Sequence, residues 1–572
     1  MTKILLLNIP SGPFPSDYPP VAISRVFEGI DPSLNCDISF FNLDYYRPSE
    51  EEIKNRIQTY SPQIIGISAI LTPAYAYVKE LSNFIRKNFP KVVQVLGGQM
   101  AVISNIILLK TKIDFCVVGE SEPIFSNLIR RLQEDTFKPK NMENYTDIKG
   151  LVLLKGNNPY FTGYEKEDFH NGMRQFNYKL ISRFTSLENY IHKIDGQYFE
   201  VRLINSDMSD FLNLIYQNNR NKNMATVFAS KGCVNKCSFC HRFFKGYRVN
   251  VVDEVIDYIE NMKKDLNVGM VMFAEENFGT HIRATSKLME YFKTSGLNWG
   301  AGAVRVKTVN EQIIKEWQEA GCVHINFGIE SLSQKMLDVM EKRSTVEETL
   351  NAIRLCYKHG VVTIPGLVIG MPGETEETLE ETIHNLASVI PDDIKVTFEI
   401  YINYVQAIPG TPIYEYARRI GLIGPTLEDE EKYIESLYDV DANDLRHFLN
   451  FTDYEKEELV YWKYYITLEL IAAYIKKHGY IKVFKYKKTR VYRIGLIYKL
   501  LPRNIRKFLL KNLMIVKYFG IGKLIHVYKK KNLSQNTKKF KDVNRSIRKI
   551  IQELPVTLRE DEVSTAIFKR GH

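Results

Sequence analysis

Three cysteines lie within eight residues of this chain, as Cys233, Cys237 and Cys240 in a C-x3-C-x2-C pattern. Thiolates are the natural ligands of iron–sulfur clusters, and close spacing on one loop lets three sulfurs converge on three irons of a cubane. No fourth cysteine is near in sequence, so one iron would stay free to chelate an amino and a carboxylate group. We therefore predict that these cysteines hold a 4Fe-4S cluster and form the catalytic centre.

A single zinc ion is the alternative, with His241 completing a Cys3His set. Adjacent Cys240 and His241 would chelate a tetrahedral ion awkwardly, and no second ligand pair follows, so the cluster is favoured. The other cysteines lie in apolar stretches, where we expect small buried hydrophobic side chains: Cys36, Cys116, Cys322 and Cys356.

The residues around the cysteines, about 224–424, alternate short apolar segments with amphipathic ones. This pattern predicts six β/α units, which form a partial (β/α)6 barrel of TIM type, and in such barrels chemistry gathers at the carboxyl ends of the strands. One intervening helix is expected over Val252–Leu266, and Thr345 with Glu348 predicts a capping box at the start of another. The expected strands are Ala225–Ala229, Gly269–Phe273, Trp299–Val304, His324–Phe327, Thr363–Ile369 and Lys395–Ile402.

With the aromatic Phe239 before the third cysteine, the motif resembles that of the radical S-adenosylmethionine (radical SAM) superfamily, and the resemblance extends from Ala225 to about Tyr416. It implies that S-adenosylmethionine binds the free iron and is cleaved by one electron to a 5'-deoxyadenosyl radical. It implies a reduced electron donor, such as flavodoxin or ferredoxin. It also implies that residues at the strand ends contact the cofactor, with acids near the methionine amino group and further contacts to the ribose. The residues expected to make these contacts are Glu275, Glu276, Arg305, Glu330, Ser331, Gly370 and Gly373.

Residues 1–155 show a second alternation of apolar strands and amphipathic helices, such as Tyr75–Asn88 and Glu122–Leu132. Continuous apolar strands separated by helices indicate a doubly wound, Rossmann-like α/β domain with a parallel sheet. The expected strands are Lys3–Asn8, Asp37–Asn42, Ile64–Ile70, Val92–Leu96, Phe115–Val118 and Leu151–Leu154. The loops after the strands, where cofactors bind in such sheets, contain Ser11, Ser68, Gly97, Gly98, Gly119 and Glu120.

The Gly97-Gly98 pair and the run Asp114–Glu122 resemble the cobalamin-binding domain of a large radical SAM subgroup, which includes the cobalamin-dependent radical SAM methyltransferases. The D-x-H-x-x-G cobalamin motif is missing, and Met100 stands where many relatives have a histidine, so this domain offers no imidazole ligand. A domain without any cofactor is the alternative. The resemblance implies cobalamin-dependent methyl transfer to an unactivated carbon, while other members of the subgroup close rings or rearrange skeletons.

Residues 156–223 are polar and irregular, and we expect a connector. Residues 425–572 are expected to be helical, and their aromatics to serve mainly in helix packing: Tyr454, Trp462, Tyr464 and Tyr465. Between positions 481 and 550 there are 22 Lys plus Arg against one acid, a charge of 22 − 1 = +21 in a chain whose net charge is +10. Such a basic, amphipathic stretch suits an anionic membrane surface, and it makes a lipid or other small molecule plausible as the substrate.

A nucleic-acid partner would also use basic residues. Relatives that modify RNA carry a second cysteine set in an amino-terminal domain, where this chain has only Cys36 and Cys116, so an RNA-modifying function ranks low. No apolar run is long enough to span a bilayer, and Met1–Pro10 is better explained as a first strand than as a signal peptide. We expect a cytoplasmic protein that is peripheral on the inner membrane face.

Overall fold

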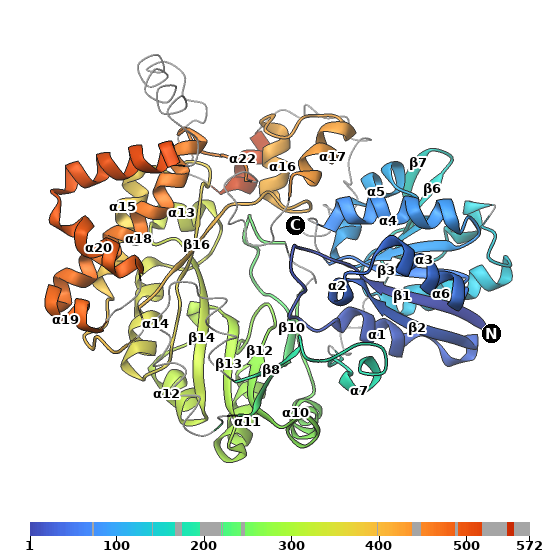
Figure 1. The fold of residues 1–572 in the computed structure, drawn as a ribbon, viewed down its shortest axis with the longest axis horizontal. Coiled ribbons are helices and arrows are strands. Elements are labelled where there is room, and N and C mark those ends of the chain that lie inside the picture. Colours follow the sequence, from blue (N-terminus) through green and yellow to red (C-terminus); the bar gives the residue numbers. More distant parts are fainter. Residues whose placement is uncertain are drawn as a thin grey trace.

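The computed structural model describes residues 1–70, 74–139, 141–165, 174–194, 219, 221–241, 246–396, 398–437, 448–486, 490–517 and 546–553. Residues 166–173, 195–218 and 220 of the predicted connector, and residues 487–489 and 518–545 of the basic segment, lie outside the described residues. Two α/β units lie beside each other, and the carboxyl-terminal helices cover the outer side of the second unit (Figure 1). The predicted fold class is confirmed.

The first unit is a seven-stranded sheet in the order β2-β1-β3-β4-β5-β6-β7. Its strands are apolar on both faces because helices cover both: Ile4 and Leu6 of β1 pack in one core, and Leu5 and Leu7 pack in the other. Five strands are parallel, and their bounds are β1 (Thr2–Asn8), β2 (Cys36–Asn42), β3 (Ile64–Ser68), β4 (Val93–Gly97) and β5 (Phe115–Val117). The helices include α1 (Val21–Gly29), α3 (Glu50–Tyr60), α4 (Tyr75–Asn88), α5 (Ser104–Lys110) and α6 (Ser121–Glu134).

Strand β6 (Leu151–Lys155) runs antiparallel to β5, although the sequence pattern predicted a parallel strand. A two-residue turn that contains Gly156, with φ of 61°, then leads into β7 (Asn158–Phe161), which was not predicted. Strand β8 (Ile191–Lys193) adds to the edge of the second sheet, also antiparallel. Both β7 and β8 lie inside the expected connector. The sequence pattern did not predict them, because a short polar edge strand has no buried face that would produce an alternating pattern.

The second unit has seven strands in the order β16-β15-β14-β13-β12-β9-β8, and the six predicted strands are parallel. The sheet is therefore the expected partial barrel. Its parallel strands are β9 (Asn223–Val227), β12 (Val268–Phe273), β13 (Asn298–Val304), β14 (Cys322–Glu330), β15 (Gly366–Ile369) and β16 (Tyr401–Tyr404). The covering helices are α10 (Val252–Leu266), α11 (Ile282–Ser295), α12 (Glu311–Glu319), α14 (Val346–Lys358) and α15 (Glu376–Ser388), and the predicted capping box at Thr345 is present.

Two features of this unit differ from the prediction. Strand β16 begins at Tyr401 rather than near Lys395. A hairpin of β10 (Ser230–Gly232) and β11 (Tyr247–Val249) flanks the cysteine loop and was not predicted. Its strands are too short to show an alternating pattern.

The carboxyl-terminal region is helical, and Trp462 and Tyr465 are buried in it, which confirms the packing interpretation of its aromatics. None of the described helices is long and apolar enough to cross a membrane. The helices are α16 (Pro412–Arg419), α17 (Leu427–Glu435), α18 (Lys456–His478), α19 (Tyr480–Tyr486), α20 (Arg490–Leu500), residues 503–517 and α22 (Ile547–Glu553).

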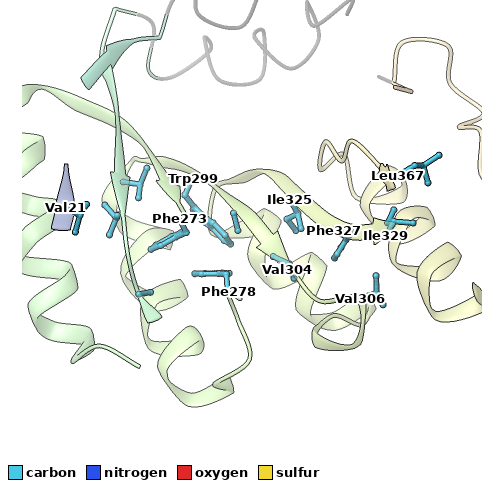
Figure 2. Close-up of a cluster of buried hydrophobic side chains, with 14 of the residues drawn as sticks. Val21, Phe273, Phe278, Trp299, Val304, Val306, Ile325, Phe327, Ile329 and Leu367 are labelled. Carbon is cyan, nitrogen blue, oxygen red and sulfur yellow. The ribbon is translucent and has the colours of Figure 1, made fainter. Parts of the chain in front are cut away.

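The outer core of the second unit depends on a group of aromatic rings (Figure 2). Trp299 is fully buried, its ring centroid lies 5.9 Å from that of Phe273 and 5.5 Å from that of Phe278, and its indole N–H donates to the carbonyl of Ala320 at 2.9 Å. The ring thus ties β12, β13 and the turn before β14 together.

We expect Trp299→Ala to lower the free energy of unfolding by about 3–5 kcal/mol, because it leaves a large cavity in a close-packed core. Trp299→Phe keeps most of the ring and should cost clearly less. Urea denaturation followed by circular dichroism measures both. Equal stability of Trp299→Ala and the unchanged protein would contradict the assigned core.

Candidate functional site

The cysteine loop follows strand β10, and the elements around it hold it in place. Cys237 is buried, Cys233 is half-buried and Cys240 is open to solvent. Ser238 anchors the loop, since its backbone N–H donates to the carbonyl of Met340 at 2.9 Å and its own carbonyl accepts from Ile413 at 3.0 Å. The loop is therefore fixed by the end of α13 (Gln334–Val339) and by the start of α16.

Asn235 surrounds two of the sulfurs with N–H groups. Its backbone N–H donates to Sγ of Cys233 at 3.4 Å, and its amide nitrogen lies 4.0 Å from Sγ of Cys237 and 3.2 Å from the carbonyl of Lys342. N–H groups directed at thiolate sulfur stabilise the anionic form and tune a bound cluster.

An ion pair of Lys342 and Glu330 lies beside the cysteines, with 2.8 Å between Nζ and Oε1. Burial raises the pKa of the Cys237 thiol, and the Lys342 ammonium opposes that rise. Burial alone would lower the pKa of Lys342, but the Glu330 and cysteine charges raise it above its usual value. Lys342 therefore stays charged next to the sulfurs, although no sequence motif indicated this residue.

Gly328 makes the room that this ion pair occupies. A Cβ at this position would lie 2.7 Å from Oε1 of Glu330 and 2.8 Å from Nζ of Lys342. Glu330 itself has φ of 65°, a left-handed conformation that is costly for a residue with a side chain. The backbone thus holds the carboxylate in a specific, strained direction at the end of β14.

The two acids after β12 have different surroundings. Glu276 acts on the site, since its charge adds to desolvation and to the charge of Cys237 in raising the pKa of the Cys240 thiol. Glu275 is buried on the helix side, in a small pocket that Val255 and Leu288 also line, and burial raises its pKa to about 8. The structure does not bring Glu275 to the cysteines.

Among the other predicted residues, Arg305 lies close enough to Cys237 for its charge to lower the pKa of that thiol. The Phe239 ring packs in the core with Lys342 above it, 5.9 Å from the ring centroid. Ser331 is buried, and its hydroxyl lies 3.3 Å from that of Thr382. Ser331 therefore serves packing in this structure rather than the cysteine site.

The loop after β15 is closed by its own carboxylate. Glu374 accepts hydrogen bonds from the backbone N–H of Gly370 at 2.5 Å and of Met371 at 3.1 Å. Burial raises the pKa of Glu374 to about 7, although these hydrogen bonds oppose the rise. Gly370 and Gly373 adopt positive φ angles of 95° and 76°, so both predicted glycines serve the shape of this loop.

In the first unit, a pocket of about 50 Å³ opens between the sheet and helices α1 and α6. Glycines shape it, and a Cβ at Gly66 would lie 2.8 Å from the Leu6 side chain. Gly98 has φ of 94°, and a Cβ there would meet the carbonyl of Ala69 at 2.6 Å. Three predicted residues line this pocket: Ser68, Gly97 and Gly98.

The other residues of this unit that the sequence analysis singled out do not line this pocket. Ser11 hydrogen-bonds Asp44 through its backbone and helps to hold the loop after β1. Gly119 has φ of 105° at the turn into α6. Met100, which stands where many relatives were expected to have a histidine, is fully buried.

Glu120 connects the two units. Its Oε1 lies 2.5 Å from Nζ of Lys231 and 2.8 Å from Arg248, which belong to strands β10 and β11 of the hairpin. The side chains of both cations are almost fully buried. Burial lowers the pKa of Lys231 to about 8, with Arg25 adding to the effect, so this ammonium depends on its carboxylate partner. Glu120 was predicted to bind a cofactor, but in this structure it holds the hairpin against the first unit.

A second contact joins the two sets of predicted cofactor loops. The side-chain nitrogen of Gln99, which follows Gly98, lies 2.6 Å from Nδ1 of His241, which follows Cys240. His241 thus contacts the first unit, whereas the zinc alternative would direct it at the cysteines. Within the described residues, no group of three or more His, Cys, Asp or Glu side chains is placed to hold a single metal ion.

The far carboxyl-terminal helix α22 also reaches the cysteine loop. A nitrogen of Arg548 donates to the carbonyl of Lys236 at 2.6 Å, and Arg548 pairs with Glu341. Ile547 and Ile551 anchor the helix in the core. Its contact with the site joins positions 312 residues apart, which a reading of local pattern could not find.

Comparison with known families agrees with this geometry. The model of the radical SAM superfamily matches residues 227–386, and the model of the B12 binding domain matches residues 21–129. The chain combines a B12-binding domain with a radical SAM domain. The first match contains the three cysteines, and the second contains the pocket of Ser68, Gly97 and Gly98.

Two curated proteins are similar to more than half of the chain, each at 26% identity. The chain is 26% identical over 411 residues to the anaerobic magnesium-protoporphyrin IX monomethyl ester cyclase of Cereibacter sphaeroides, a match that covers 70% of this chain and 60% of the cyclase, less than two thirds of its length. It is 26% identical over 382 residues to an uncharacterized methyltransferase of Pyrococcus horikoshii, covering 64% of this chain and 72% of that protein.

The fold is similar to that of a solved radical S-adenosylmethionine methyltransferase, TsrM from Kitasatospora setae, with cobalamin and a [4Fe-4S] cluster bound. The TM-score is 0.56 at 18% identity, and the match covers 74% of this chain and 79% of TsrM. At this identity the likeness supports the fold.

The residues of the radical SAM domain fit the cofactors that the family implies. Three thiols on a pinned loop, with N–H groups and the Lys342 ammonium beside them, suit an anionic 4Fe-4S cluster. The glycine-lined pocket of the B12-binding domain suits a ligand that must approach the backbone closely. With Met100 buried, no imidazole comes from this position.

We expect Glu120→Gln to lower the free energy of unfolding by about 3–5 kcal/mol, because Lys231 and Arg248 would stay buried without a full counter-charge. Glu134→Gln is the matched control. It removes a carboxylate that is 60% exposed and paired with Arg131. It should lower the free energy of unfolding by less than about 0.5 kcal/mol. Chemical denaturation of the two variants side by side measures the difference, and equal costs would show that the triad does not hold the units together.

We expect Gly328→Ala to lower the rate of S-adenosylmethionine cleavage at least about tenfold, since the new methyl group must displace the Glu330–Lys342 pair. Iron content should stay normal because the cysteine loop is anchored elsewhere. Gly12→Ala, where an added Cβ meets open space, is the control. Release of 5'-deoxyadenosine at several concentrations of S-adenosylmethionine provides the measurement, and unchanged kinetics in Gly328→Ala would assign the pair a purely structural role.

Proposed function

We propose that this protein is a cobalamin-dependent radical SAM enzyme that transfers a methyl group to an unactivated carbon of a small-molecule or lipid-like substrate. The observation that carries the proposal is the contact between the two cofactor loops. Gln99 follows the glycines that line the B12-domain pocket, and it touches the residue after Cys240 at 2.6 Å. Two cofactors bound to these loops would therefore face one common space.

The residues of the chain would bind, orient and shield the reactants. Cys233, Cys237 and Cys240 would hold the cluster, and Lys342 and Arg305 would balance its negative charge. Glu276, Glu330 and the loop closed by Glu374 would orient S-adenosylmethionine at the barrel mouth. When bound, the cluster and S-adenosylmethionine supply an organic radical, and cobalamin supplies a methyl carrier.

Ring closure or rearrangement on the same scaffold is the second candidate, and the similarity to the anaerobic cyclase favours it. Both candidates need a reduced electron donor such as flavodoxin or ferredoxin. An RNA-modifying function has less support, because the amino-terminal unit has only Cys36 and Cys116 and so lacks a second cysteine set.

We expect purified protein, reconstituted anaerobically with iron, sulfide and cobalamin, to move label from methyl-labelled S-adenosylmethionine to the bound corrinoid and then to product. Cys237→Ser should lose the cluster absorption and form less than about 1% of the 5'-deoxyadenosine. Cys36→Ser, a change at a half-buried cysteine of the first unit, should keep both. 5'-Deoxyadenosine release without label transfer would favour the cyclase candidate, and zinc in place of iron would overturn both.

We further propose that the protein works at the inner membrane face, with its carboxyl-terminal region in contact with lipid. The basic composition of residues 481–550 supports this proposal. Residues 487–489 and 518–545 of that segment lie outside the described residues.

A further inference from the structure

The helix of residues 503–517 packs on the protein through ion pairs and the apolar residues Leu510, Met514 and Ile515, and it leaves a separate apolar stripe exposed. Four basic residues pair with glutamates of α15 and α18: Arg503 with Glu380, Arg506 with Glu469 at 2.8 Å, Lys507 with Glu376 at 2.8 Å and Lys511 with Glu458. Glu458 and Glu469 are buried, so these cations neutralise acids of the protein itself. Arg506 and Lys511, whose side chains are 12% and 13% exposed, are consequently not available to an anionic partner.

The outward side of the same helix is apolar at helical spacing. Ile505, Phe508, Leu509, Leu513 and Val516 recur at intervals of three and four residues, and Phe508 and Leu513 are 59% and 60% exposed. A helix that packs on a protein normally turns such a stripe inward. Here the inward side is formed by the ion pairs together with Leu510 and Met514, and the second stripe stays exposed.

The neighbouring helices α19 and α20 continue this apolar surface. Twelve of the 23 exposed large hydrophobic side chains in the described residues lie between Ile481 and Val516, and such a concentration marks an interaction surface rather than scattered exposure. We call it the apolar face. Outside the helix of residues 503–517 it contains Ile481 (85% exposed), Phe484, Tyr486, Ile494, Ile497, Leu500 and Leu501.

Basic residues border the apolar face. Lys482, Lys485 and Arg493 are exposed, and among the described residues no ion pair is found for them. Figure 1 shows α19 and α20 on the outer edge of the molecule, away from the B12-binding domain. Aliphatic and aromatic side chains with lysine and arginine at the border match the interface of an anionic bilayer, where apolar groups enter and cations stay at the headgroups.

The helix of residues 503–517, which forms one end of the apolar face, lies on the side of the barrel mouth. Lys507 pairs with Glu376, the first residue of α15, and Lys511 pairs with Glu458 near the start of α18. Both helices begin next to the loop of Gly370 and Glu374, and Leu459 of α18 contacts Gly370. This loop ends strand β15 on the edge where the cysteines lie.

We infer that the apolar face is a membrane-docking surface that inserts its apolar side chains into an anionic lipid bilayer beside the mouth of the radical SAM domain. This inference deepens the proposed membrane location and does not depend on methyl transfer, since binding is measured without turnover. It assigns the attraction chiefly to the outward apolar stripe and the three border cations. The four inward-facing cations contribute to folding.

Co-sedimentation of the full chain with vesicles of phosphatidylcholine containing about one third phosphatidylglycerol tests the inference. We expect Ile505→Ser/Phe508→Ser/Leu513→Ser to weaken binding at least about tenfold, because it removes inserted apolar area. Ile282→Ser, at a 69% exposed position on α11, is the matched control and should bind like the unchanged protein. Unchanged binding by the triple variant would overturn the inference.

A second variant separates the two parts of the surface. Lys482→Glu/Lys485→Glu/Arg493→Glu should lose binding to anionic vesicles and regain part of it at neutral vesicles or in high salt. Sedimentation velocity on the same proteins tests the rival occupant, a second copy of the chain. A dimer that the triple serine variant dissociates, with no vesicle binding by the unchanged protein, would overturn the inference in favour of self-association.

Discussion

The site depends on one constraint: a loop without regular structure must hold three thiols at fixed positions. A loop of this kind cannot fix its own shape, so its backbone groups have to be hydrogen-bonded to neighbouring elements. Ser238 provides this through its two backbone bonds to Met340 and Ile413, and Asn235 provides it through its side chain. The elements at the ends of β14 and β16 thus determine where the sulfurs lie, and the loop's own spacing determines only that they can converge.

Buried charges then connect the parts that this loop must face. The Lys342–Glu330 pair lies under the cysteines, the Glu120 triad lies between the two units, and the glutamates of α18 meet the cations of the helix that follows α20. Buried ion pairs add little to stability when compared with apolar packing, but they penalise any arrangement that separates the partners. Their placement at the borders between units indicates that they fix relative orientation, which apolar surfaces alone would leave less specific.

The sequence predicted the repeating layers well, because long apolar strands and amphipathic helices have clear periods. Helices α4 and α10 have the predicted bounds, and all twelve predicted strands are present, although β6 runs in the other direction and β16 starts later. Short strands such as β7, β8 and β10 were not predicted, because three or four residues are too few to show a hydrophobic period. The direction of an edge strand depends on its connection, which no local pattern records.

Prediction of the site succeeded for residue types that carry chemistry at a fixed spacing. It failed where a residue's role depends on the direction of its side chain in the tertiary structure. The three cysteines, Arg305 and Glu330 are brought together. Glu275 and Glu276 were equivalent in the sequence, and only the different surroundings that the loop after β12 gives them separate the two. Lys342 and Arg548 stand in no motif, so their roles follow from contacts over long sequence distances.

The helix of residues 503–517 shows the same limit most clearly. From composition, its lysines and arginines were assigned to an anionic membrane surface. The glutamates of α15 and α18 instead pair with several of these cations, because a buried carboxylate is costly without a counter-charge. Once Lys507 and Lys511 face the protein, the helical period places Leu509 and Val516 on the opposite side. The exposed stripe thus accompanies the ion pairs of Glu376 and Glu458, and a local sequence pattern, which does not record where these glutamates lie, could not reveal which apolar side chains stay exposed.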